Sequence, residues 1–121
     1  MYTVTVRDHI MIAHSLPDPR FGPAQNMHGA TYVVDAIFTA EKLNDLNVVI
    51  DIGEASKLLK KVLNKLNYKN LDELKEFSKV LTTTEYLAWY IHQQIRKELL
   101  GEISLKITLK ESHVASASYE E

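Results

Sequence analysis

The stretch ATYVVDAIFTA, residues 30–40, alternates with a period of two and is partly apolar on both faces. One face carries Tyr32, Val34, Ala36 and Phe38, and the other carries Thr31, Val33, Asp35 and Ile37. Because successive side chains of a strand point to opposite faces, this pattern predicts a long strand that packs on both faces.

Further strands are predicted on either side of this stretch. Residues 2–12 are rich in β-branched side chains and alternate, and the strand is expected to end before Pro17. Residues 15–27 contain three prolines and no apolar period, which indicates an ordered loop. Asn44 and Asp45 mark a turn, after which residues 46–52 are predicted to return as a strand and close a hairpin.

The period then changes to that of two amphipathic helices. The first apolar stripe is opposed by lysines and consists of Ala55, Leu58, Leu59, Val62, Leu63 and Leu66. Thr82 and Glu85 have the spacing of a capping box, and the helix that follows is expected to stop at Gly101. Residues 103–109 and 113–119 are predicted to be the last strands.

This order predicts an α+β fold, β-β-α-α-β-β, with a four-stranded antiparallel sheet and two helices on one face. Residues 1–121 are expected to form a single domain. The face of the sheet without helices carries Val33 and Ile37, and the last strand carries Ala115 and Ala117. We therefore expect copies of the same chain to cover that face or the edges, which makes the protein a homo-oligomer.

Composition excludes several classes of function. The formal net charge of -2 lacks the basic excess of a nucleic-acid-binding protein, so no nucleic-acid partner is expected. The chain has no cysteine, which excludes disulfides and a thiol nucleophile. Neither a signal peptide nor a membrane-spanning apolar run is recognisable, and the expected location is the cytoplasm.

Five segments, in order, resemble the 6-pyruvoyl-tetrahydropterin synthase and 6-carboxy-tetrahydropterin synthase family. They are Ala13-His14-Ser15-Leu16, His28-Gly29-Ala30-Thr31-Tyr32, Val49-Ile50-Asp51-Ile52, Thr83-Thr84-Glu85, and Leu109-Lys110-Glu111-Ser112 followed by Tyr119. The resemblance implies the tunnelling fold, assembly into trimers or hexamers, and a pterin substrate. It also implies that Glu111 anchors the pterin ring and that His14 and His28 bind a zinc ion.

The chain also departs from the family pattern. The third zinc histidine is replaced by Ala30, and the catalytic cysteine by Ala24. The family's Leu-Asp-His relay corresponds to Leu66-Asn67-Tyr68. A catalytic zinc ion normally has three protein ligands, so a third donor is needed, and His113 is the first candidate. His9 is a poorer one because its odd separation from His14 puts it on the other strand face, and His92 is expected at the surface.

Several polar residues could bind or process a substrate. The Glu111 carboxylate can accept two hydrogen bonds from the N–H and amino edge of a pterin or guanine ring. Thr83 and Thr84 could contact the same ring or merely cap a helix, and Gln25 and Asn26 lie in the polar loop at the expected mouth of the site. Tyr68 and His113 are candidates for proton transfer.

Two functions are therefore expected from the sequence. The first is a metal-assisted lyase, or a related enzyme with altered chemistry, that cleaves or isomerises the side chain of a dihydroneopterin-like substrate. The alternative is a non-catalytic oligomeric scaffold that binds a pterin or a purine. Tight binding without turnover would favour the second function.

Overall fold

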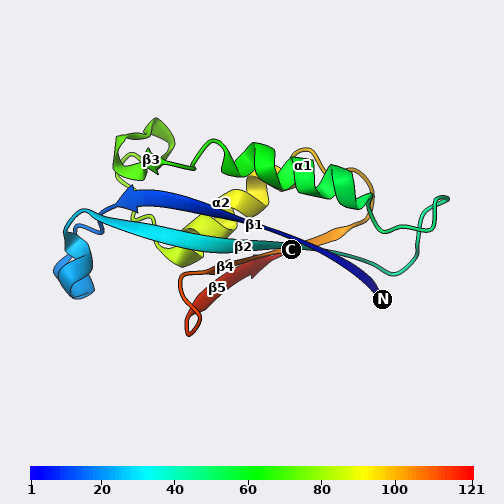
Figure 1. The fold of residues 1–121 in the computed structure, drawn as a ribbon, viewed down its shortest axis with the longest axis horizontal. Helices are drawn as coiled ribbons and strands as arrows, with labels where there is room; N and C mark the ends of the chain where they lie inside the picture. The colour runs from blue at the N-terminus through cyan, green and yellow to red at the C-terminus, as the bar shows by residue number, and fades with distance from the viewer.

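The computed structural model describes residues 1–121 and is built around a long, twisted, two-stranded ribbon (Figure 1). β1 (Tyr2–His14) and β2 (His28–Ala40) are antiparallel, in a register that runs from Tyr2 opposite Ala40 to His14 opposite His28. The segment that joins them contains 3₁₀ turns over Pro19–Gln25 and projects beyond one end of the sheet.

The sheet has five strands in the order β3-β1-β2-β4-β5. β4 (Ser104–Lys110) pairs antiparallel with β2, and β5 (Ser116–Glu120) pairs antiparallel with β4. The α+β prediction is confirmed, with one addition: the two-residue strand β3 (Lys69–Asn70) pairs with β1 in parallel. The last predicted strand is shorter than expected, and His113 lies in the turn before it.

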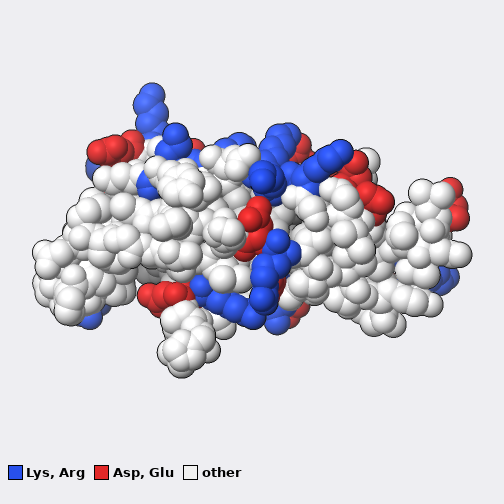
Figure 2. All heavy atoms as spheres, in the orientation of Figure 1, with Lys and Arg blue, Asp and Glu red and all other residues white.

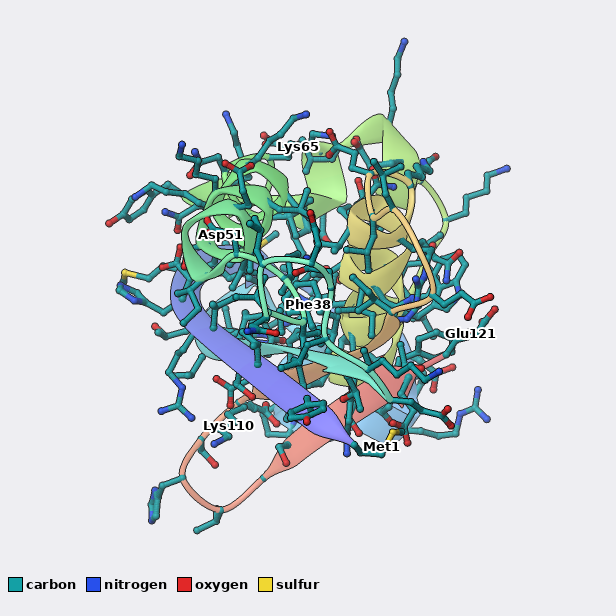
Figure 3. The ribbon with its side chains drawn as sticks, turned by 90° about the vertical axis from the view of Figure 1, so that its right-hand side faces the viewer. Met1, Phe38, Asp51, Lys65, Lys110 and Glu121 are labelled. Atoms are coloured by element: carbon teal, nitrogen blue, oxygen red, sulfur yellow. The ribbon has the colours of Figure 1, made fainter.

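α1 (Ile52–Leu63) and α2 (Thr84–Arg96) pack on the same face of the sheet (Figure 1). Phe38 is fully buried between the sheet and the two helices (Figure 3). The predicted α1 stripe supplies Ala55, Leu59, Val62 and Leu63 to this core, and the lysines of α1 face solvent. The period of the sequence therefore predicted this face correctly.

The predicted strand at residues 46–52 is wrong. Both edges of β2 are already paired, with β1 on one side and β4 on the other, so a returning strand has no free edge. The Asn44 side chain instead accepts hydrogen bonds from the backbone N–H groups of Leu46 and Val48. The Asp51 side chain then accepts a bond from the Glu54 N–H and caps the start of α1.

The predicted capping box at α2 is displaced by one residue. Thr83, not Thr82, caps the helix, because its hydroxyl oxygen accepts a hydrogen bond from the Tyr86 N–H at 3.2 Å. Thr82 is buried and its side chain turns toward β1 instead. α2 also ends at Arg96, before the predicted stop at Gly101.

The helix-free face of the sheet is organised around Asp35. Its carboxylate accepts two hydrogen bonds from Arg7, at 2.6 and 3.0 Å, and lies 3.5 Å from the Lys110 ammonium. Val33 and Ile37 flank this triad on the same face and are half-buried, whereas Ala117 pairs with Leu109 on the helix side. Ala117 therefore lies in the edge strand β5 and not on the helix-free face.

The ion triad predicts a pH-dependent contribution to stability. The hydrogen bonds from Arg7 lower the pKa of Asp35 below its ordinary value of 3.8, so the stabilisation is complete above that pH and is lost as the pH falls further. We expect Asp35→Asn to lower the free energy of unfolding by about 1–2 kcal/mol at pH 7. Urea unfolding at several pH values measures this, and the difference from the parent should shrink below pH 3.8.

Asp45→Asn is the matched control, because Asp45 is exposed in the loop after β2. A loss of stability equal to that of the control, or one that does not vary with pH, would contradict the assigned role of the triad.

Charged side chains are unevenly distributed over the surface. Lysine and arginine side chains gather along the α1 side, while the end formed by the segment between β1 and β2 is nearly free of charge in the same view (Figure 2). No helix of the structure has the length and apolar character that crossing a bilayer requires.

Candidate active site

Two histidines face each other at the end of the β1–β2 ribbon. The register places His14 directly opposite His28, and the centroids of their rings lie 4.6 Å apart in an edge-on arrangement. His14 is 3% exposed and His28 is half-buried. The sequence predicted these residues to act together, and the structure brings them into contact.

Each imidazole is held through its Nδ1 atom. His28 Nδ1 donates to the backbone carbonyl of Asn26 at 2.8 Å, because a carbonyl oxygen can only accept. His14 Nδ1 lies 2.9 Å from the Thr82 hydroxyl, and the two groups are 68 residues apart in sequence. No hydrogen bond of the structure engages Nε2 of either ring, and a neutral ring whose Nδ1 donates carries its lone pair on Nε2.

The environment keeps His14 uncharged. Burial lowers the pKa of His14 and the nearby His28 ring lowers it further, while the Asp72 carboxylate acts in the opposite direction. Its folded pKa thus lies below the ordinary value of 6.5. At neutral pH His14 is an imidazole that can accept a proton.

Tyr32 lies four residues from His28 along β2, and Glu111 follows Lys110, the strand partner of Val33. Tyr32 opposes Ile10 in β1, and burial raises the pKa of its hydroxyl, an effect that the Thr84 side chain partly offsets. Glu111 follows the last residue of β4 and is exposed. Its charge raises the pKa of both Tyr32 and His14.

The other predicted binding residues are more dispersed. Thr84 lies beside Tyr32, whereas the Thr83 hydroxyl is engaged in capping α2. The Gln25 side chain donates to the Gly22 carbonyl within its own loop at 3.0 Å. Asn26 approaches the site through its carbonyl oxygen, which holds His28.

The two predicted proton-transfer residues lie apart from this cluster within one chain. Tyr68 is 79% exposed after α1, its backbone is in the left-handed region at φ 60°, and its N–H donates to the Met11 carbonyl. His113 is exposed in the turn between β4 and β5. A left-handed backbone is costly for a non-glycine residue, so Tyr68 is held in place by its surroundings.

One histidine prediction is wrong. His92 is buried, not at the surface, and its Nε2 lies 3.0 Å from the Leu105 carbonyl oxygen. Its ring also packs edge-on against Tyr119, so it joins α2 to β4 and β5. His9 is exposed on the sheet face opposite to His14.

The protein's own side chains do not complete the zinc site that the family resemblance implied. No group of three or more His, Cys, Asp and Glu side chains is placed to hold a metal ion. His14 and His28 supply two imidazoles, and Ala30 stands on the same strand face where a third would be needed. This donor set does not fit a three-histidine zinc centre.

Restoring the third imidazole should create tight zinc binding. Residue 30 shares its strand face with His28 and lies opposite Ile12, two residues from His14. We expect Ala30→His to raise zinc affinity at least about tenfold over the parent, as competition with a chromophoric chelator would measure.

Thr31→His is the control, because residue 31 points to the opposite face and should leave zinc affinity unchanged. If the parent itself retains about one zinc ion per chain after dialysis, the prediction fails, and a further donor such as His113 must complete the site.

Two hollows lie away from this cluster. They have volumes of 690 and 470 Å³ and lie among residues 39–51, the first half of α1 and residues 98–104. That end of the ribbon is opposite to the His14–His28 end.

Sequence reasoning missed two members of the cluster. Thr82 was assigned to a capping box, since nothing local distinguishes it from Thr83. Tyr32 was recognised as a strand residue and as part of the family-like segment that begins at His28, but no role was given to its hydroxyl, whose pKa the Thr84 side chain affects. The even spacing of Tyr32 and His28 on one strand was the available signal.

A sheet of this order with two helices on one face has the tunnelling fold. A family model described as 6-pyruvoyl tetrahydropterin synthase matches residues 3–121. The chain belongs to this family of pterin-metabolism enzymes.

Solved structures agree with the fold. The 6-pyruvoyl tetrahydropterin synthase of Caenorhabditis elegans superposes with a TM-score of 0.84 at 24% identity, over 99% of this chain and 95% of that chain. The enzyme of Plasmodium falciparum gives 0.82 at 20% identity, over 99% and 97%.

A third similarity is to a protein of a different activity. Dihydroneopterin monophosphate aldolase of Pyrococcus furiosus is 28% identical over 82 residues, which are 68% of this chain and 67% of the relative.

Proposed function

We propose that the protein is a pterin aldolase that cleaves the side chain of a phosphorylated dihydroneopterin. The observation that carries the proposal is the buried His14, with its lowered pKa, against His28 in a chain that has no cysteine. The similarity to dihydroneopterin monophosphate aldolase supports the choice of reaction and substrate.

An aldol cleavage needs a base and a place for the electron pair. The base takes the proton from the hydroxyl on the second side-chain carbon, and the bond between the first and second carbons breaks to release glycolaldehyde phosphate. The electron pair passes into the ring imine, and protonation of the first carbon gives 6-hydroxymethyl-dihydropterin. We assign the base to His14, because its lowered pKa leaves it uncharged at neutral pH.

The pterin ring would be held by residues at the end of β4 and at the start of α2. We assign the ring N–H and amino edge to Glu111, which can accept both hydrogen bonds. Thr84 and Thr83 lie at the start of α2, on the helix side of the sheet. Gln25 and Asn26 would border the entrance, where Asn26 also fixes His28.

We further propose that the protein works as a homo-oligomer, as a trimer or a hexamer. β3 pairs with only two residues of β1, Ile12 and Ala13, so most of the outer edge of β1 has no partner within the chain. The outer edge of β5 is likewise free, since β5 ends the sheet. Unpaired edges favour strand pairing between copies, which light scattering after gel filtration would measure as an oligomeric mass.

Assembly would also give Tyr68 and His113 a role. Both side chains are exposed in the single chain, and a neighbouring copy could bring either one to the substrate. We assign to them the return of a proton to the first side-chain carbon.

Incubation with dihydroneopterin monophosphate tests the proposal. Release of glycolaldehyde phosphate by the parent, and not by His14→Ala, is expected. Tight binding of the substrate without any release would contradict the aldolase assignment and favour a pterin-binding scaffold that lacks catalysis.

A further inference from the structure

A smaller cavity lies between the segment that follows His14 and the segment that follows β3. It has a volume of 340 Å³, and its walls include Ser15, Asp72, Lys79 and Leu81. Ser15 directly follows His14, and Leu81 directly precedes Thr82, which contacts the His14 ring. The cavity therefore begins next to the residue assigned as the base.

The cavity has a polar wall that is already organised. The Asp72 carboxylate accepts hydrogen bonds from the Ser15 hydroxyl at 2.5 Å and from the Ser15 N–H at 3.3 Å. Asp72 also acts on His14 through its charge. A carboxylate in this position can accept further hydrogen bonds from substrate hydroxyls, although it would repel a phosphate placed against it.

Lys79 provides the opposite charge. It is exposed and takes part in none of the ion pairs of the structure. Its backbone is in the left-handed region at φ 60°, which is strained for a residue with a side chain. A lysine that is kept in a strained conformation at a cavity wall, without a carboxylate partner, suits an anionic ligand.

The order of the strands gives the direction of the substrate. Glu111 lies at the end of β4, His28 in β2, His14 in β1, and Asp72 just after β3, and these strands are successive neighbours. Neighbouring strands lie about 4.8 Å apart, and the register adds a separation along the strands, because Glu111 follows Lys110, the partner of Val33, whereas His28 begins β2.

We propose that this cavity is the specificity site for the phosphorylated end of the substrate, with Lys79 as the cation that binds the phosphate monoester. Ser15 and Asp72 line the cavity between His14 and Lys79 and border the second side-chain carbon. This assignment rests on the proposed pterin aldolase function and adds the residue that distinguishes a phosphorylated substrate from a free one.

Calorimetry with neopterin and neopterin monophosphate tests the assignment, with the oxidised ring used so that binding is measured without turnover. The parent should bind the monophosphate at least about tenfold more tightly than neopterin. Lys79→Met should abolish that preference and leave the affinity for neopterin unchanged. Lys75→Met is the control, because Lys75 is exposed nearby but does not line the cavity, and it should keep the preference.

Equal affinities in the parent, no binding of either compound, or a preference that survives Lys79→Met would each overturn the assignment. Cleavage assays separate this failure from that of the proposed function. Cleavage of dihydroneopterin and its monophosphate with equal KM would overturn only the role of Lys79. A preference that depends on Lys79, without cleavage of either compound, would overturn only the aldolase activity.

Discussion

Replacing His14 by alanine is expected to lower kcat/KM for cleavage of dihydroneopterin monophosphate by at least about 100-fold. The imidazole is buried against Thr82 and His28, and alanine has no group that can take the proton from the substrate hydroxyl. The pH dependence of kcat/KM in the parent should also reflect the protonation of His14. Because the pKa of His14 is lowered by burial, activity in the parent should fall only when the pH drops below the ordinary histidine value of 6.5.

His9→Ala is the matched control for this variant. His9 lies in the same strand but on the opposite face, and it is exposed. Its replacement should leave kcat/KM within a factor of about two, as expected for a surface change. A His14→Ala protein that folds, by circular dichroism, and keeps more than about one tenth of the parent activity would exclude His14 as the base.

Replacing Glu111 by glutamine is expected to weaken pterin binding by about 10- to 100-fold. The carboxylate can accept two hydrogen bonds from the ring, whereas an amide accepts with only one end and presents N–H groups with the other. Calorimetric titration with neopterin measures the change in Kd. Because Glu111 lies in an exposed turn after β4, the substitution should leave the free energy of unfolding within about 0.5 kcal/mol of the parent.

Glu102→Gln provides the comparison, since Glu102 is exposed in the loop before β4, at the other end of that strand. It should bind neopterin as the parent does. An unchanged Kd in Glu111→Gln would remove the ring anchor from the account and, with it, the direction assigned to the bound substrate.

The fold was largely predictable because its long elements have strong periods. The alternation in residues 30–40 and in β4 predicted strands at the centre of the sheet, and the stripe of α1 predicted the face that is buried. Residues 46–52 were misassigned because their apolar character is real, with Val49 buried, but the pairing edges of β2 are occupied. Whether an edge is free is a property of the whole sheet, and no local pattern reports it.

The site was predictable only in part, for a related physical reason. His14 and His28 could be paired because cross-strand neighbours follow from the ribbon register. Thr82 could not be assigned to His14, since the contact joins a loop to a strand 68 residues away. His92 was misplaced because its polar neighbours Gln93 and Gln94 suggest solvent, while its own side of α2 packs on β4.

The identity of the products tests the central claim most directly. Mass spectrometry should be applied to a reaction of the parent protein with dihydroneopterin monophosphate in deuterated water. The account predicts glycolaldehyde phosphate and a 6-hydroxymethyl-dihydropterin that carries a single deuteron on its hydroxymethyl carbon, because that carbon is protonated from the solvent-exchanged acid. A product that keeps all three side-chain carbons, or no product at all, would contradict the aldolase account.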